Sequence, residues 1–222
     1  MGRAAVLAVA ASAALVSCLA PGTPPGWSSS TILAGQHAAQ VDTPSGSPAP
    51  RAGWEASGSA SRSYQLTLGP SARYVITAPV QPGDQLDWNK LPGFSDCGDI
   101  DLSVNGAMFG WRWRIDVSTP RLELVPYANA AGVHQYPSQP LVTLSEAELA
   151  LQQPLRYEIE IDGAVYRFHI SGTIGGRVID EVAQLSRSCP TSPTTTGKWL
   201  SGFYFGGTSV SPSTIYAFML ES

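Results

Sequence analysis

The sequence predicts an all-β fold, an antiparallel β-sandwich with at most one short helix. From residue 63 onward, short segments alternate apolar and polar residues with a period of two, which is typical of strands with one buried face. Turn-forming residues separate these segments, and the chain has 22 Gly and 18 Pro among its 222 residues. The pair Asp162-Gly163 between two such segments is a strong hairpin signal, because both central positions of that turn need a positive φ.

The predicted strands follow one another at intervals that suit a sandwich or barrel. They cover residues 64–68, 74–77, 100–104, 109–117, 122–127, 156–161, 165–170, 203–205 and 214–220. A two-residue turn at Asp162-Gly163 would place Glu158 opposite Arg167. One helix is predicted over residues 144–152, because Thr143 and Glu146 have the spacing of a capping box.

The first twenty residues have the composition of an export signal. Arg3 precedes an apolar run, residues 4–16, which is too short to span a bilayer as a helix. The run ends in Leu15-Val16-Ser17-Cys18, which resembles the bacterial lipobox. This resemblance implies a signal peptide over residues 1–17, a lipid on Cys18, and contact with a membrane through that lipid only. The alternative is ordinary cleavage after Ala20, although Pro21 would make that a poor site.

Residues 18–62 are predicted to form a flexible tether, and residues 63–222 the folded domain. Of the 44 residues from 19 to 62, 28 are Gly, Pro, Ser or Ala. Such a segment has too little apolar surface to offset the entropy lost on ordering. Trp27 and Trp54 are interpreted as stray aromatic residues of this linker; contact with the domain or the membrane interface is the alternative.

The remaining two cysteines, Cys97 and Cys189, are predicted to form a disulfide, because an exported protein meets an oxidising compartment. The bridge would close a long loop and stabilise the fold by about 4 to 5 kcal/mol. A redox-active or nucleophilic thiol is the alternative, but the sequence has no CxxC motif.

The charge balance excludes several classes of partner. The chain has 13 Lys and Arg against 17 Asp and Glu, a net charge of −4, and no basic run, so we expect no nucleic-acid partner. Only 14% of the residues are charged, which favours a location outside the cytoplasm. The lipobox resemblance implies that this location is a bacterial cell surface or the periplasm.

Few motifs indicate catalysis or a cofactor. His134 and His169 have no partner at a zinc-binding spacing, and no GxSxG motif is present. Asp99 and Asp101 offer oxygen ligands for calcium, but the EF-hand pattern fails because Val104 stands where its glycine is needed. Apart from this weak calcium candidate we expect no cofactor.

The segment Gly110-Trp111-Arg112-Trp113-Arg114 is the most informative one. On a strand, the two tryptophans face one side and the two arginines the other. Guanidinium groups bind carboxylates in a bidentate manner, which suits acidic sugars. The alternative is that the arginines pair with Glu123 or Glu158 on neighbouring strands. The ligand-binding face is predicted to combine Arg112, Arg114, Tyr127, Glu158, Arg167 and His169.

Several segments together resemble a secreted bacterial family of concanavalin A-like jelly rolls. They cover residues 88–95, 110–114, 122–127, 157–163, 166–170 and 202–207. The pieces Lys90-Leu91-Pro92-Gly93 and Phe205-Gly206-Gly207 are similar to those of alginate and glucuronan lyases. A lyase of this kind needs a general base and a cation that neutralises the uronate carboxylate. The resemblance implies a jelly roll with His169, Tyr127, Tyr136 or His134 as base and Arg112 or Arg114 as the cation, although the Gln-x-His segment of one alginate-lyase family is missing.

Three functions remain open from the sequence. The first is a surface lipoprotein whose jelly-roll domain binds a polysaccharide or cell-envelope glycan. The second is a polysaccharide lyase that cleaves uronic-acid-containing glycans by β-elimination. The third is a structural envelope protein without a small ligand.

Overall fold

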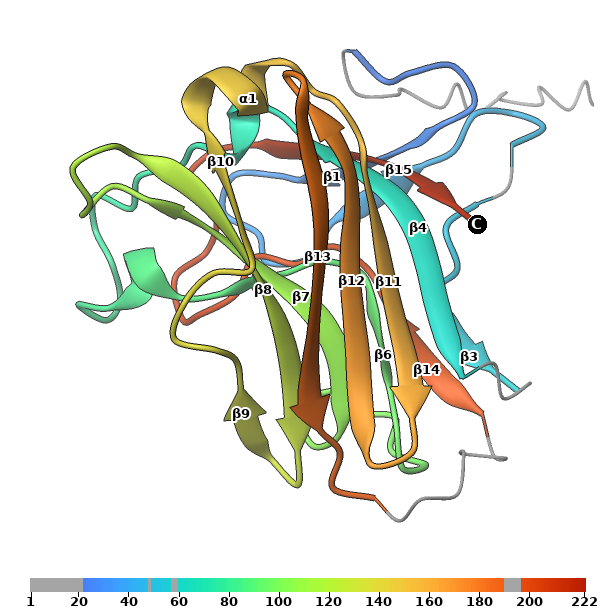
Figure 1. Cartoon of the computed structure of the whole chain (residues 1–222). Coiled ribbons are helices and arrows are strands. Elements are labelled where there is room, and N and C mark those ends of the chain that lie inside the picture. Colours follow the sequence, from blue (N-terminus) through green and yellow to red (C-terminus); the bar gives the residue numbers. More distant parts are fainter. Residues whose placement is uncertain (1–21, 48, 57–59, 190–196) are drawn as a thin grey trace, which may run out of the picture.

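The structure is a computed structural model that describes residues 22–47, 49–56, 60–189 and 197–222. Two antiparallel sheets pack face to face as a jelly-roll-type sandwich, which confirms the predicted fold class (Figure 1). The predicted signal peptide and the lipidation site Cys18 lie outside the described residues. Within those residues, no helix is both long and apolar enough to span a bilayer.

Each sheet has a defined strand order. Sheet A runs β13 (Arg177–Ser186), β12 (Val165–Ile174), β11 (Leu155–Asp162), β4 (Ser61–Leu68), β15 (Ile215–Glu221), β1 (Ser28–Ile32) and β2 (Gln40–Asp42). Sheet B runs β10 (Val142–Ser145), β8 (Arg121–Ala130), β7 (Gly106–Arg114), β6 (Gly93–Ser95), β14 (Lys198–Ser201) and β3 (Gly53–Glu55), with β5 (Asn89–Lys90) beside β7 and β9 (Val133–Gln135) beside β8. Three short helical elements complete the described fold: η1 (Pro70–Ala72), η2 (Asp84–Leu86) and α1 (Glu146–Ala150).

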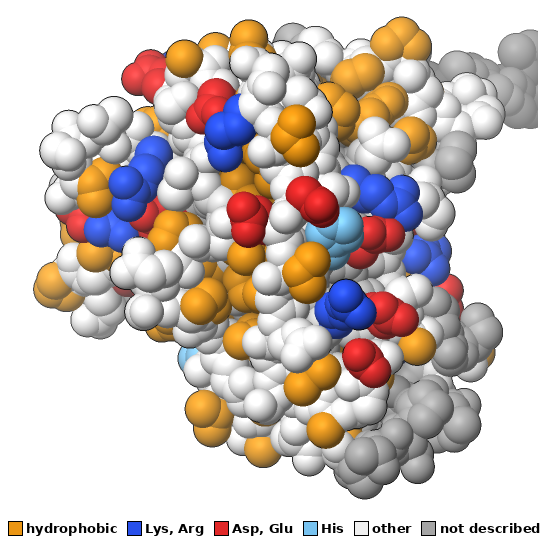
Figure 2. Space-filling model, viewed as in Figure 1, with side chains coloured by type: hydrophobic (Ala, Val, Ile, Leu, Met, Phe, Trp, Pro, Cys, Tyr) orange, Lys and Arg blue, Asp and Glu red, His pale blue; other side chains and the backbone are white. Residues whose placement is uncertain are grey.

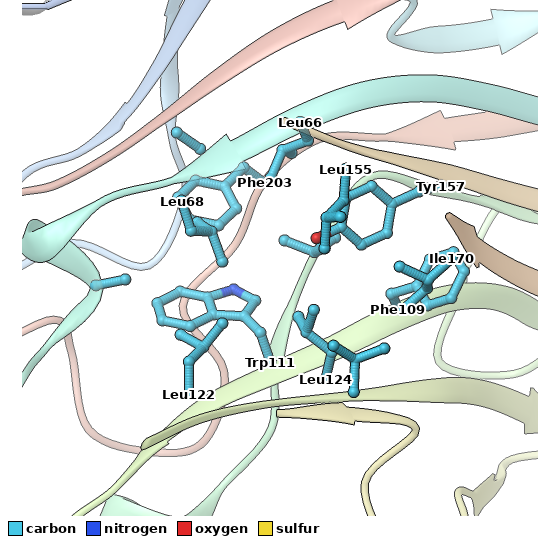
Figure 3. Close-up of a cluster of buried hydrophobic side chains, with 14 of the residues drawn as sticks. Leu66, Leu68, Phe109, Trp111, Leu122, Leu124, Leu155, Tyr157, Ile170 and Phe203 are labelled. Carbon is cyan, nitrogen blue, oxygen red and sulfur yellow. The ribbon is translucent and has the colours of Figure 1, made fainter. Parts of the chain in front are cut away.

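The core lies between the two sheets and is rich in aromatic rings (Figure 3). Sheet B contributes Phe109 and Trp111, and sheet A contributes Tyr157 and Ile170. Phe109 meets the Tyr157 ring edge to face at 5.2 Å between centroids, a favourable arrangement for aromatic pairs. Because alternate residues of β7 face inward, Arg112 and its neighbours at even positions point away from the core.

The predicted tether is wrong for the part of it that forms strands. β1, β2 and β3 all lie within residues 18–62, and β1 pairs with β15 along its whole length. Ser28, Ser29 and Ser30 are buried although they are polar and small. The composition misled because backbone pairing with β15 and one fully buried apolar side chain, Ile32, hold β1 to the sheet. Trp54 accordingly lies on β3 of sheet B and not in a linker.

Some local predictions also fail. Residues 74–77, 100–104 and 203–205 form no strand; the last makes only isolated bridges at Tyr204. In the 100–104 loop, Asp101 accepts a hydrogen bond from the Ser103 amide, so a side chain takes the place of a ladder partner. The helix begins later than predicted, because its capping box is formed by Ser145 and Glu148. Thr143 and Leu144 belong to β10.

The β11–β12 hairpin turns one residue later than expected. Asp162 pairs with Val165, so the turn residues are Gly163 and Ala164, with φ +59° at Gly163. As a result, Glu158 lies opposite His169 and not opposite Arg167.

The disulfide between Cys97 and Cys189 is present, as predicted, with 5.5 Å between the two Cα atoms. It joins the loop after β6, a strand of sheet B, to the segment that follows β13, a strand of sheet A.

Candidate functional site: an aromatic groove on sheet B

The predicted ligand-binding face does not exist as one surface. Arg112, Arg114 and Tyr127 belong to β7 and β8 of sheet B, whereas Glu158, Arg167 and His169 belong to β11 and β12 of sheet A. The residues that alternate with them along each strand are buried in the core, so the two sets lie on the outer faces of opposite sheets. The residues expected to cooperate in a lyase, His169 with Tyr127 and the two arginines, are therefore separated by the thickness of the sandwich.

The two arginines are engaged by one buried carboxylate. The Glu123 side chain is only 1% exposed and accepts hydrogen bonds from Arg112 Nε at 3.0 Å and Nη2 at 2.8 Å. Arg114 Nη1 lies 3.2 Å and Arg121 Nη2 3.0 Å from the same carboxylate. Burial alone would raise the pKa of Glu123, but the hydrogen bonds from Arg112 and Arg121 and the guanidinium charges hold it below its usual value. The structure therefore shows the alternative considered from the sequence, in which the two arginines pair with Glu123.

The other half of the predicted face is a set of surface ion pairs. Charged side chains gather over β11 to β13 on the face of sheet A (Figure 2). His169 lies between two carboxylates, with Nδ1 3.1 Å from Glu158 and Nε2 2.7 Å from Asp180, and Arg156 also contacts Glu158 at 2.9 Å. A hollow of about 440 Å³ lies here, and its lining includes Arg167. Arg156, Glu158, His169 and Asp180 pair with one another, which is typical of a solvated sheet face.

The outer face of sheet B carries a groove lined by aromatic rings. Two hollows, of about 580 Å³ and 260 Å³, share Lys90, Tyr127 and His134 and therefore adjoin one another. We call the two together the aromatic groove. Its rings and polar side chains are Asp87, Trp88, Lys90, Asp101, Ser103, Tyr127, Asn129, His134, Tyr136, Trp199, Ser201, Phe203 and Tyr204. Its size is in the range of ligand sites, in which apolar surface is combined with a few placed polar groups.

The floor and walls of the groove come from different parts of the chain. Met108 and Tyr127 rise from β7 and β8 and form, with Trp88, an apolar cluster separate from the core. One wall is the loop 100–103, held by the Asn129 side chain, which donates a hydrogen bond to the Leu102 carbonyl at 2.5 Å. Residues 38–39 and 202–204 form a further part of the lining. There Tyr204 stacks on the His37 ring at 5.5 Å, with 13° between the planes.

Lys90 lies between the aromatic rings of the floor. Its Nζ donates a hydrogen bond to the Trp88 carbonyl at 2.6 Å and lies 3.6 Å from the centre of the Tyr127 ring. Burial lowers the pKa of Lys90 to about 7, partly opposed by the charge of Asp87. At neutral pH this amine is therefore divided between its charged and neutral forms.

Tyr127, Tyr136 and His134, three of the four residues considered as possible bases, come together where the smaller hollow meets the larger one. The Tyr127 and Tyr136 rings stack at 5.5 Å, and His134 Nδ1 lies 2.6 Å from Asn129 Oδ1. Burial raises the pKa of Tyr127 to about 12, and the neighbouring Tyr136 adds to this. At neutral pH the Tyr127 hydroxyl is protonated and acts as a hydrogen-bond donor.

The two candidate calcium ligands each accept a hydrogen bond from a neighbouring residue. Asp99 accepts a hydrogen bond from Asn105 Nδ2 at 2.6 Å, and Asp101 accepts one from the Ser103 amide at 2.8 Å. Hydrogen bonds from Ser103 also lower the pKa of Asp101. Elsewhere among the described residues, Asp96 clusters with Cys97 and Cys189, whose sulfurs are joined in the disulfide.

Sequence reasoning missed Lys90, Trp199 and Tyr204 as site residues. A signal for Tyr204 was available, because Phe203 and Phe205 are buried and alternation places the residue between them outside. Trp199 likewise lies between the buried Lys198 and Leu200 on β14. Lys90 was part of a quoted motif but received no role.

Comparison with known proteins gives likeness of low identity only. No family model matches the chain, and no curated protein matches its sequence. Among solved structures, an alginate lyase from Klebsiella pneumoniae is similar with a TM-score of 0.44 and 14% identity, over 72% of this chain and 56% of that one. The chain thus spans little more than half of that lyase. A structure described as a native glycosidic hydrolase has a TM-score of 0.39 and 12% identity, over 90% of this chain and 78% of that one. The CBM2 module of an evolved Dit protein from Lactobacillus casei BL23 phage J-1 has a TM-score of 0.35 and 11% identity, over 88% and 70% of the two chains.

Proposed function

We propose that this protein binds a polysaccharide along the aromatic groove of sheet B. The observation that carries the proposal is the combination of exposed rings and hydrogen-bonding groups in one continuous hollow. Sugar rings have C–H faces that pack on aromatic side chains and hydroxyl rims that need polar partners. Tyr204 and Tyr136 supply exposed rings at the two ends, while Tyr127, Asn129 and His134 supply polar atoms between them.

The groove favours binding over catalysis on an acidic sugar. A β-elimination enzyme must neutralise the uronate carboxylate before a proton can leave the neighbouring carbon. Arg112 and Arg114, the cations expected to do so, are held by Glu123. Lys90 lines the groove, but its amine donates to the Trp88 carbonyl and lies over the Tyr127 ring.

A polysaccharide lyase remains the second candidate, because a phenol, an imidazole and an amine line the same hollow. His134 would accept the proton from C5 of a uronate. The C4–O bond would break as the C4=C5 double bond forms, and the Tyr127 hydroxyl would give its proton to the leaving oxygen. Such a product absorbs ultraviolet light. An absorbance rise with alginate, glucuronan or hyaluronan that is lost in Tyr127→Phe would establish this activity.

Replacing the exposed groove rings should weaken binding. Affinity gel electrophoresis with laminarin, mixed-linkage β-glucan, xylan, glucomannan, alginate and polygalacturonate should show retardation by at least one polymer. Tyr204→Ala and Tyr136→Ala should each weaken that retardation by roughly five- to tenfold, because each removes one stacking ring.

Val178→Ala is a matched control, since Val178 is exposed on β13 of the opposite sheet and should leave retardation unchanged. The proposal fails if no polymer retards the wild-type protein. It also fails if both tyrosine variants bind as the wild type does, since the ligand would then lie elsewhere.

We further propose that the protein is exported and anchored by a lipid on Cys18. The disulfide supports an oxidising compartment, and the lipobox-like sequence Leu15-Val16-Ser17-Cys18 supports the anchor. Wild-type protein from the membrane fraction should carry an added acyl mass that Cys18→Ser lacks, as measured by intact mass spectrometry. Equal masses in the two samples would rule out the anchor.

A further inference from the structure

We propose that Trp54 and Trp199 form an additional sugar-binding subsite, which extends the aromatic groove to the edge of sheet B. The inference rests on the proposed function and adds to it the kind of ligand: an extended, unbranched stretch of polysaccharide longer than the groove itself. Neither tryptophan was assigned a role from the sequence.

The two tryptophans occupy neighbouring positions on one surface. In the antiparallel β14–β3 pair, Trp199 lies directly opposite Trp54. The residue after Trp199, Leu200, is buried in the core, so Trp199 and its cross-strand partner face outward. Trp54 is 46% exposed and Trp199 is 41% exposed. Large aromatic residues are usually more deeply buried, so two exposed indoles opposite one another mark a contact surface.

The Trp54 ring packs closely against the backbone of a glycine. A Cβ built at Gly197 would lie 2.7 Å from Trp54 Cζ2 and 3.0 Å from its Cε2, closer than carbon atoms approach. The indole therefore covers the bare backbone of Gly197, whose φ of +93° also favours glycine. A ring that is already held in place loses little conformational entropy when a ligand packs on it.

Trp199 connects this pair to the aromatic groove. It lines the larger hollow together with Ser201, the next outward-facing residue of β14. The strands cross below this surface in the order β3, β14, β6, β7 and β8, with β9 beyond them. At about 4.8 Å between strands, the path from β3 to β9 is roughly 24 Å long. A ligand that follows this path has to be an oligomer of several sugars.

Pyranose rings in an extended chain suit this surface best. A sugar whose hydroxyls are mostly equatorial presents a C–H face to an indole and keeps its hydroxyls in water. The subsite should therefore contribute to the affinity for long chains and leave the affinity for short ones unchanged, since a short oligosaccharide is accommodated within the groove alone.

The test compares chain lengths in a Trp54 variant. The probes are size-fractionated oligosaccharides made from whichever polymer of the gel panel retards the wild-type protein most, titrated by calorimetry. Trp54→Ala should bind the long oligosaccharides roughly five- to tenfold more weakly and the short ones as the wild type does. Trp54→Phe should restore part of the loss, because it keeps an aromatic face. Val178→Ala serves again as the exposed control.

The possible results separate this inference from the proposed function. Unchanged binding of long chains by Trp54→Ala overturns the subsite and leaves groove binding intact. An equal loss for short and long chains also overturns it, because Trp54 would then support the fold of the groove and not contact the ligand. A wild-type protein that no polymer retards refutes both the groove and its extension.

Discussion

An Arg187→Met protein should lose about 3 to 5 kcal/mol of unfolding free energy. Arg187 and Asp96 form an ion pair of two fully buried side chains, with Nε 2.6 Å from Oδ2. Removing the guanidinium leaves the Asp96 carboxylate in the interior without its compensating charge, and an unpaired buried charge is among the most costly defects in a folded protein. Urea unfolding with the disulfide intact measures the loss.

The expected loss of unfolding free energy is large because Asp96 and Arg187 also make hydrogen bonds to other residues. Asp96 also accepts hydrogen bonds from the Tyr166 hydroxyl at 2.9 Å and from the Cys97 amide at 2.7 Å. Arg187 Nη1 donates to the Gly163 carbonyl, at the β11–β12 turn, at 2.6 Å. The pair thus joins the end of a sheet A hairpin to the loop that carries the disulfide. The loss of one partner affects every one of these contacts.

Two further variants separate the charge from the contact network. The double variant Asp96→Asn/Arg187→Met removes both charges and should recover part of the stability lost in Arg187→Met, because no unpaired charge remains. Arg167→Met, on the exposed face of β12, should change the unfolding free energy by less than about 0.5 kcal/mol. A loss in Arg187→Met no larger than that of Arg167→Met would contradict the buried-pair account.

Most of the sandwich was predictable, because alternation is a local property of each strand. Phe109, Trp111 and Tyr157 were placed on alternating segments, and all three are buried. What alternation cannot give is the sheet to which a strand belongs. β7 and β12 both present polar residues outward, yet they belong to different sheets, so Arg112 and His169 point in opposite directions. A site built from several strands can be predicted only when it is known which strands share a sheet. Long-range pairing sets this strand order.

The tether was mispredicted for a different reason. Residues 28–30 are all serine, so composition indicated a solvated linker. Their strand gains its place from backbone pairing with β15, almost two hundred residues later in the chain, and no local pattern encodes that partner. The same error concealed Trp54, because the interpretation of an aromatic residue depends on whether the segment around it is folded.

Replacing Glu123 by glutamine should destabilise the protein by about 2 to 3 kcal/mol, the largest effect expected on the groove side of sheet B. Three guanidinium groups, those of Arg112, Arg114 and Arg121, contact this one carboxylate. A neutral amide can accept hydrogen bonds from them but cannot balance their charge. Because the arginines are partly exposed, water screens their repulsion, and the loss stays below that of a fully buried pair.

The same carboxylate should shape the acid limb of the stability curve. The pKa of Glu123 is lower in the folded than in the unfolded protein, because the arginine contacts outweigh the effect of burial. Its contribution is therefore fully present above the unfolded-state pKa and is lost as the pH falls through the folded-state pKa. Urea unfolding at a series of acidic pH values should show a shallower decline for Glu123→Gln than for the wild type. Glu160→Gln, exposed on sheet A, should change the unfolding free energy at neutral pH by less than about 0.5 kcal/mol.

Glu123 also accounts for why the arginines of β7 do not form the anion site that the sequence indicated. Arg112 lies flat over the Trp88 ring, 3.9 Å from its centre, and directs its nitrogens at Glu123 and at the Leu86 carbonyl. In Glu123→Gln the guanidinium charges lose their fixed counter-ion beside the groove, so retardation by alginate or polygalacturonate should increase relative to the wild type. If retardation by these acidic polymers is unchanged in a folded Glu123→Gln protein, the arginines are kept from the ligand by position and not by their pairing with Glu123.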